Sequence, residues 1–139
     1  YEILRCLVGS EMCIRDSSTD ALGRKIDVVK LAMPKPIYMT EEEVAGLDLF
    51  DGEPTRDTVS PLSASYVNLY IGNKTVVMPA FGGENTEYDL RAKSEVQKVF
   101  PDREIIQIYA RDILIGGGNI HCITHQIPSF VRKETPYDK

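Results

Sequence analysis

The sequence predicts an α/β fold, and three local patterns lead to that prediction. Residues 72–74 form a short glycine-containing stretch between two runs rich in β-branched and aromatic residues, which indicates a hairpin. A segment with an apolar stripe at helical spacing follows, and after it comes another strand-like run. Together with one earlier strand, these elements make one β-rich α/β unit rather than a self-sufficient fold.

The N-terminal half contains one predicted strand, one short helix and a loop. Ile26–Met33 is a β-branched run closed by two prolines, which is typical of a strand. Thr40 precedes three glutamates, and Glu43 stands in the capping-box position, so a helix is expected to begin there. Gly46 keeps that helix brief, and residues 48–61 carry enough Asp, Gly, Pro and Ser to predict a surface loop.

The hairpin and the helix after it are the clearest elements of the second half. The hairpin strands are expected at Ser65–Ile71 and Thr75–Pro79. Asn85 or Thr86 then offers a cap for a helix that Pro101 stops. The apolar stripe of this helix is formed by Tyr88, Ala92, Val96, Val99 and Phe100.

Three further elements are predicted towards the C-terminus. Glu104–Tyr109 alternates or runs apolar and indicates a returning strand. A turn or short helical piece is expected at Arg111–Ile115, just before three consecutive glycines. The pattern of Cys122–Ile127 predicts a final strand.

Composition bounds the function class. The chain has 139 residues, of which 42% are hydrophobic and 27% charged, as in globular proteins. A net charge of −5 without a basic cluster argues against nucleic-acid binding and suits a cationic substrate. No apolar run approaches the roughly 18 residues that a membrane span needs, and no secretory pattern is present, so we expect no membrane partner and a cytoplasmic location.

The segment Gly116–Gln126, which reads GGGNIHCITHQ, is the strongest candidate for chemistry. Three adjacent glycines are costly to order and make sense where the backbone turns sharply or approaches a ligand. Cys122 follows this turn closely and is a candidate nucleophile, although a free cysteine is more often simply buried. Gly116, Gly117, Gly118 and Asn119 are candidates for shaping a substrate pocket, with a plain turn as the alternative.

The segment GGGNIHCITHQ resembles the active-site segment of the agmatine deiminases, a branch of the guanidine-modifying superfamily that includes peptidylarginine deiminases. Three upstream blocks resemble the same family in the same order: DALGRKIDVVKLAMPKPIYMTEEE, SASYVNLYIGN and VFPDREIIQIYARDILIGGGN. The resemblance covers most of residues 18–132. The family often has glutamine where His125 stands here, but this position is not the nucleophile.

The resemblance implies the C-terminal part, about two ββαβ-type units, of a five-fold pseudosymmetric α/β propeller, the pentein fold. It implies that Cys122 attacks the guanidinium carbon of agmatine and forms a covalent amidino-cysteine. Hydrolysis then gives N-carbamoylputrescine and ammonia, a step towards putrescine, with no metal or organic cofactor. It also implies that the catalytic histidine and the guanidinium-binding carboxylates come from units outside this chain. We therefore expect this chain to be inactive on its own.

The N-terminus contains a segment that does not fit. Residues 6–17 resemble a translated sequencing adaptor, whereas residues 1–5 look like a family remnant. The alternative is a real helix, because Ile3, Leu4, Leu7 and Val8 have helical spacing. We therefore predict a catalytic-domain segment at 18–132 and a tail at 133–139. Without Cys6 and Cys13, only Cys122 remains, so no disulfide framework is expected.

Four other polar residues have open roles. If Cys122 lies on a strand, His121 and His125 point away from the face of the thiol, which favours packing roles for both. Asp89 lies in the first turn of the predicted helix, where a carboxylate is favourable, so a structural role is expected. Asn68 could line the channel or bond a neighbouring backbone group.

Three rival interpretations remain. Two histidines and the cysteines offer metal ligands, but their spacing matches no compact zinc site. A non-catalytic structural or interaction fragment is the alternative of another class. Free or peptidyl arginine is the alternative substrate, and oligomeric state, including a homo-oligomer, is left open.

Overall fold

The computed structural model describes residues 19–20, 22–25, 29–48, 50, 52 and 56–127. The chain separates into two compact units, with the boundary between Lys30 and Leu31. In the first unit, Thr19 and Lys25 form an isolated antiparallel bridge. The predicted segments 1–5, 6–17 and 133–139 lie outside the described residues.

The strand predicted at Ile26–Met33 is wrong for the part of it that the structure describes. Its first three residues lie outside the described part, and Val29–Met33 contains no strand. The backbone N–H of Ala32 donates to the Glu95 carboxylate at 2.9 Å, so a helix side chain uses this donor instead of a neighbouring strand.

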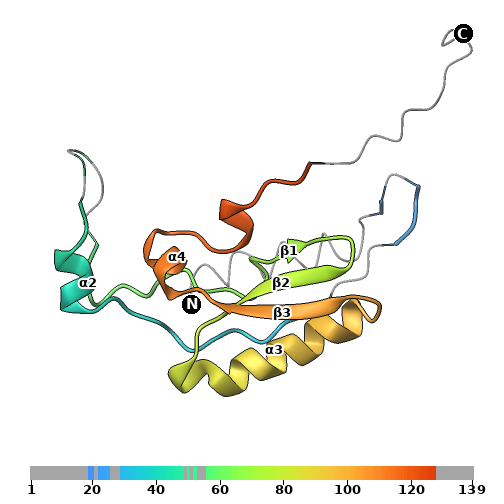
Figure 1. Ribbon diagram of the computed structural model, residues 1–139, viewed down its shortest axis with the longest axis horizontal. Helices are drawn as coiled ribbons and strands as arrows, with labels where there is room; N and C mark the ends of the chain where they lie inside the picture. Colours follow the sequence, from blue (N-terminus) through green and yellow to red (C-terminus); the bar gives the residue numbers. More distant parts are fainter. Residues whose placement is uncertain are drawn as a thin grey trace, which may run out of the picture. The chain divides into compact units, whose positions relative to one another are not determined.

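The described strands form a three-stranded sheet in the order β1–β2–β3 (Figure 1). β1 (Tyr70–Ile71) and β2 (Thr75–Ala80) are the antiparallel hairpin that the glycine turn predicts, with Tyr70 opposite Val77. β3 (Glu104–Tyr109) runs parallel to β2 along its whole length. The α/β class is therefore confirmed, with a helical crossover between two parallel strands.

The first hairpin strand is shorter than predicted, because Ser65–Leu69 forms a turn. The N–H groups of Asn68 and Leu69 donate to the carbonyls of Ser65 and Val67 at 3.4 and 2.8 Å. These local hydrogen bonds take the place of ladder bonds to β2.

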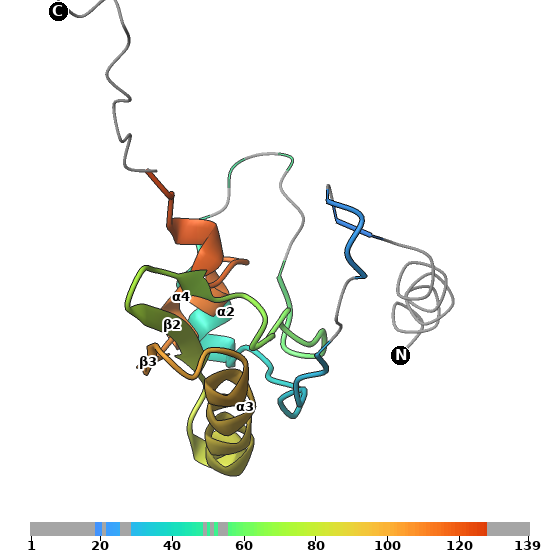
Figure 2. The same cartoon turned by 90° about the vertical axis from the view of Figure 1, so that its right-hand side faces the viewer.

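The helix α3 (Thr86–Val99) lies along one face of the sheet (Figures 1 and 2). Of its predicted stripe, Ala92 and Val96 are buried and Tyr88 and Phe100 are partly buried against the core, whereas Val99 is 42% exposed. Pro101 follows the helix as expected. Asn85 stands at the N-cap position, but its side chain does not cap the helix, because its side-chain Oδ1 accepts from the Lys35 N–H at 2.7 Å.

The core lies between α3, the sheet and the segment before the hairpin. Val76 and Met78 of β2 and Ile105 of β3 are buried, as expected for alternating side chains that face a helix. The cluster consists of Ala64, Tyr66, Val76, Met78, Phe81, Ala92, Val96, Ile105 and Leu114.

A buried carboxylate joins α3 to the core. Asp89 accepts hydrogen bonds from the Tyr66 hydroxyl at 2.7 Å and from the N–H groups of Phe81 and Gly82 at 3.0 and 2.8 Å. Burial, and then the Asp89 carboxylate, raise the pKa of Tyr66, so its hydroxyl remains a donor. The role of Asp89 is structural, as predicted, through these bonds.

Two short helices are joined by an ion pair. α2 (Glu41–Ala45) begins with the predicted capping box: Glu43 N–H donates to Thr40 Oγ1 at 3.2 Å, and Thr40 N–H donates to Glu43 Oε2 at 2.8 Å. Arg111, the first residue of α4 (Arg111–Ile115), donates to both Glu43 oxygens at 2.6 and 2.8 Å. The capping box thus also fixes the start of the helix that leads into the glycines.

The predicted final strand Cys122–Ile127 is wrong. His121–Ile123 forms the 3-10 turn η2, and the rest of the segment is irregular as far as it is described. The N–H groups of Cys122 and Thr124 donate to the carbonyls of Asn119 and His121 at 2.9 and 3.1 Å. These turn bonds occupy the groups that a strand would need.

Candidate active site

The glycines connect α4 to the turn that carries Cys122. Gly116 ends α4, and Gly117 follows in the left-handed region with a φ of 91°. The N–H of Gly117 donates to the carbonyl of Leu114 at 2.9 Å. A positive φ is open to glycine at little cost, so this residue allows the chain to leave the helix and turn back towards the core.

Gly118 lies directly against the candidate nucleophile. A Cβ atom at this position would be 2.9 Å from Cys122 Cβ and 3.3 Å from Cys122 Sγ. Any larger side chain would therefore displace the cysteine. Gly118 also lines the hollow beside Cys122, and the choice between a pocket-shaping role and a plain turn stays a prediction.

Asn119 is completely buried beneath this turn. Its carbonyl accepts the Cys122 N–H at 2.9 Å, and its side-chain Oδ1 accepts the Ile120 N–H at 2.9 Å. Its Nδ2 has no hydrogen-bond partner among the described residues. Asn119 therefore stabilises the backbone turn around Cys122 through these two hydrogen bonds.

Asn68 contacts the thiol from the turn before β1. Its Nδ2 donates to Cys122 Sγ at 3.2 Å, and its Oδ1 accepts the His121 N–H at 2.8 Å. Asn68 thus bonds a backbone group of a distant turn and also contacts the thiol, while a channel-lining role stays a prediction. The pKa of Cys122 is lowered, first by the Asn68 amide and then by backbone hydrogen bonds from Asn119 and Cys122.

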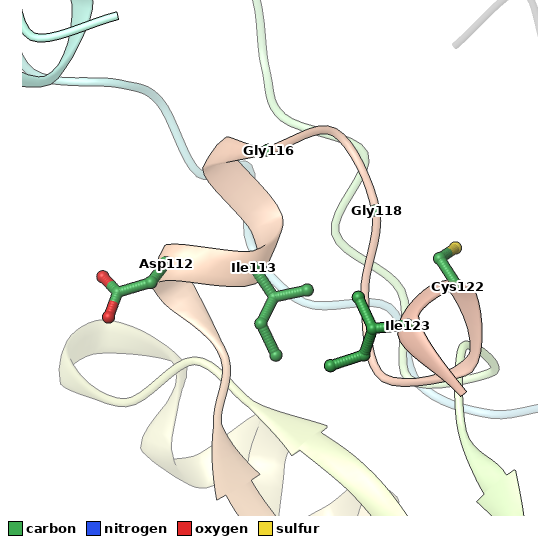
Figure 3. A pocket seen from close by; sticks show the side chains of 6 residues that line it. All are labelled: Asp112, Ile113, Gly116, Gly118, Cys122 and Ile123. Carbon is green, nitrogen blue, oxygen red and sulfur yellow. The ribbon is translucent and has the colours of Figure 1, made fainter.

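A hollow of about 530 Å³ lies beside the thiol, which is exposed (Figure 3). Ile113 and Ile123 extend towards one another across it, and Asp112 points away from Cys122 on the far side of α4. The lining residues are Asp112, Ile113, Gly116, Gly118, Cys122 and Ile123. No sequence signal singled out Asp112, because a carboxylate at the start of a short helix is common.

The two histidines border a different hollow from the one that Cys122 borders. This second hollow has a volume of about 440 Å³ and is lined by Leu69, Tyr70, Ile71, His121, Thr124, His125 and Gln126. The strand alternation that predicted this separation is absent, because His121 and Cys122 are consecutive residues of a 3-10 turn.

Metal ligation and membrane insertion find no support in the described part of the chain. Within residues 19–127, apart from the gaps given above, no three His, Cys, Asp or Glu side chains gather in a way that could hold a metal ion. Cys6 and Cys13 lie outside this part. No helix among the same residues has the length and apolarity to cross a bilayer.

The family described as Porphyromonas-type peptidyl-arginine deiminase matches residues 10–128. The chain belongs to this family. The match includes the region of α4, the glycines and Cys122. It also begins inside residues 6–17, whose resemblance to an adaptor stays a prediction.

Curated relatives of the family support a more specific similarity. A Latilactobacillus sakei protein is 50% identical over 113 residues, which cover 81% of this chain and 30% of that protein. The agmatine deiminase of Pseudomonas aeruginosa is 42% identical over 126 residues, which cover 91% of this chain and 33% of the enzyme. The chain thus spans about a third of the length of these relatives.

Solved structures of the family agree with the fold. The agmatine deiminase of Enterococcus faecalis is 35% identical with a TM-score of 0.72, over 86% of this chain and 31% of that chain. An arginine deiminase structure from Porphyromonas gingivalis is 28% identical with a TM-score of 0.65, over 88% and 30%. The chain therefore has the α/β fold of part of a pentein-type deiminase.

Proposed function

We propose that this chain carries the nucleophile of an agmatine deiminase. The observation that carries the proposal is the exposed Cys122 sulfur, which lies beside a hollow and accepts a hydrogen bond from Asn68 at 3.2 Å. A thiolate is the nucleophilic form of cysteine, and a lowered pKa increases its population. The agmatine deiminases of Pseudomonas aeruginosa and Enterococcus faecalis supply the substrate class.

The reaction begins when Cys122 Sγ attacks the guanidinium carbon of agmatine. A carbon–nitrogen bond then breaks, and the leaving nitrogen departs as ammonia after it gains a proton. Water attacks the resulting amidino-cysteine, the carbon–sulfur bond breaks, and the thiolate is regenerated. Agmatine and water thus give N-carbamoylputrescine and ammonia, a product suited to putrescine synthesis.

The remaining chemistry needs groups that this chain is not expected to supply. A planar guanidinium is held best by carboxylates, and ammonia departs best when a general acid such as histidine protonates it. Since the chain spans about a third of its relatives, we propose that these groups come from the rest of a longer deiminase.

The test is Cys122→Ser in the complete protein that carries this segment. Serine is far less ionised than cysteine at neutral pH, so ammonia release from agmatine should fall by about three orders of magnitude or more. A haloacetamidine probe should label the wild type and not the variant. The control is the double variant Cys6→Ser/Cys13→Ser, which should keep full turnover. Ammonia release that survives Cys122→Ser would reject the assignment.

Arginine is the second candidate substrate, because the family description names peptidyl-arginine and one similar structure is described as an arginine deiminase. Measuring kcat/KM for agmatine, free arginine and a peptidyl arginine separates these alternatives. We expect agmatine to have the highest value.

A further inference from the structure

Asn68 lies far from Cys122 in the sequence but uses both ends of its side chain at the turn that carries the thiol. Oδ1 accepts the His121 N–H at 2.8 Å, while Nδ2 lies 3.2 Å from Cys122 Sγ. A backbone N–H can only donate, so the oxygen must face His121. The amide nitrogen must then face the sulfur, and the orientation of the amide is determined by the contacts themselves.

The turn that presents Asn68 is anchored in the core. Tyr66, two residues earlier, is 1% exposed and bonds the buried Asp89 carboxylate. The N–H of Asn68 donates to the Ser65 carbonyl, and the hairpin begins two residues later at Tyr70. The backbone of Asn68 is therefore anchored by the core and the hairpin, while the bond from the His121 N–H orients its amide.

We propose that Asn68 is a catalytic residue, whose amide N–H holds the reacting Cys122 sulfur as a thiolate and fixes its orientation. This inference rests on the proposed function for the identity of the reaction. The hydrogen bond from Asn68 is the leading cause of the lowered pKa of Cys122. Asn68 therefore affects both the charge and the position of the nucleophile.

A neutral donor suits a cationic substrate better than a charged one. A lysine, arginine or protonated histidine beside the thiol would also favour the thiolate, but it would repel the incoming guanidinium. An amide stabilises the thiolate through its N–H without adding a net charge. Among the described residues, His121 and His125 line the other hollow and not the one that Cys122 lines.

The test measures the thiol itself in the 139-residue chain, with Cys6→Ser/Cys13→Ser as the background so that Cys122 is the single cysteine. The rate of iodoacetamide alkylation is followed against pH, in buffer and in urea. Asn68→Asp keeps an oxygen for the His121 N–H and replaces the donor to sulfur with an anion, whereas Asn68→Ala removes both contacts. Asn73→Asp, in the hairpin turn, is the control for the added charge.

The background protein should titrate at a lower pH in buffer than in urea. Both Asn68 variants should lose this difference, and their alkylation at pH 7 should be roughly threefold to tenfold slower. Asn73→Asp should behave like the background protein. A purely structural Asn68 would lower the melting temperature of Asn68→Ala without moving the alkylation profile.

Two results would overturn the proposal. One is an Asn68→Asp profile equal to that of the background protein, and the other is a background profile that urea does not change. Alkylation requires no agmatine, so it tests the role of Asn68 alone. The proposed function fails by a different result, namely ammonia release from agmatine by the Cys122→Ser variant. In the complete protein, Asn68→Asp should lower kcat more than it raises KM, since its contact is with the sulfur.

Discussion

At the scale of single residues, the space around Cys122 is the most constrained feature of the site. Gly118 leaves no room for a Cβ, Asn119 is buried beneath the turn, and Asn68 contacts the sulfur from another element. Each contact restricts where the thiol can point. Substitutions at neighbouring residues can therefore displace Cys122 even though they leave the cysteine itself unchanged.

Gly118→Ala should show this effect. The added methyl would lie 2.9 Å from Cys122 Cβ, so the cysteine must shift away and its hydrogen bond from Asn68 should break. Overpacking of this kind costs about 1–3 kcal/mol, and alkylation of Cys122 at pH 7 should slow as in the Asn68 variants.

The matched control is Gly46→Ala, at the end of α2. Gly46 has a φ of −84°, and a Cβ there would be 3.4 Å from the nearest atom, an ordinary contact. This variant should alkylate like the unchanged chain. Equal alkylation of Gly118→Ala and Gly46→Ala would show that the glycine does not constrain the thiol.

Part of this arrangement could be predicted from the sequence. The glycine run indicated a close approach of the backbone, and the resemblance indicated the cysteine. The partnership of Asn68 with Cys122 could not be predicted, because it depends on how two distant turns pack. For the same reason, the sequence left the role of Asn68 open, whereas the structure shows both ends of its side chain bonded at the turn of Cys122.

At the scale of elements, the sequence predicted helices and strands correctly where the signature of the element lies within a short segment. The capping box of α2, the hairpin turn, α3 and β3 all have their signatures within a few residues. The strands expected at 26–33 and 122–127 had suitable composition, but their described N–H groups bond a helix carboxylate or turn carbonyls instead. A tertiary contact at Ala32, and local turn bonds at Cys122 and Thr124, thus override the strand preference of these segments.

The ion pair between α2 and α4 gives an element-scale prediction. Hydrogen bonds from Arg111, and then from Thr40, lower the pKa of Glu43 from 4.5 to about 2. Because the pKa is lower in the folded state, the stabilisation is complete above pH 4.5 and is lost as pH falls towards 2. Glu43→Gln should therefore cost about 1 kcal/mol near neutral pH and progressively less in acid.

The measurement is the melting temperature of the chain and of Glu43→Gln at pH 6 and at pH 3. Glu41→Gln is the control, because it removes a carboxylate from the same helix that makes no bond with Arg111. A difference between wild type and Glu43→Gln that stays constant or grows in acid would contradict the expected loss of this ion pair at low pH.

At the scale of the whole molecule, several apolar side chains of β3 are exposed rather than packed against another element. Ile106, Ile108 and Tyr109 are 37%, 44% and 62% exposed, although they belong to a strand of the central sheet. Exposed apolar side chains in a strand indicate contact with another element of structure. The relatives are about three times longer than this chain, which is consistent with such cover.

The last prediction is that the 139-residue chain alone releases no measurable ammonia from agmatine and is only marginally stable. Its thiol is exposed and its two histidines border another hollow, so we expect an acid and guanidinium-binding carboxylates to come from the rest of a longer protein. Each missing group of this kind lowers the rate by roughly a hundredfold or more, so their joint loss should abolish turnover. Cooperative unfolding and ammonia release with excess agmatine are measured for residues 1–139 and 18–139. A sharp unfolding transition together with turnover in either protein would mean that the chain holds a complete site.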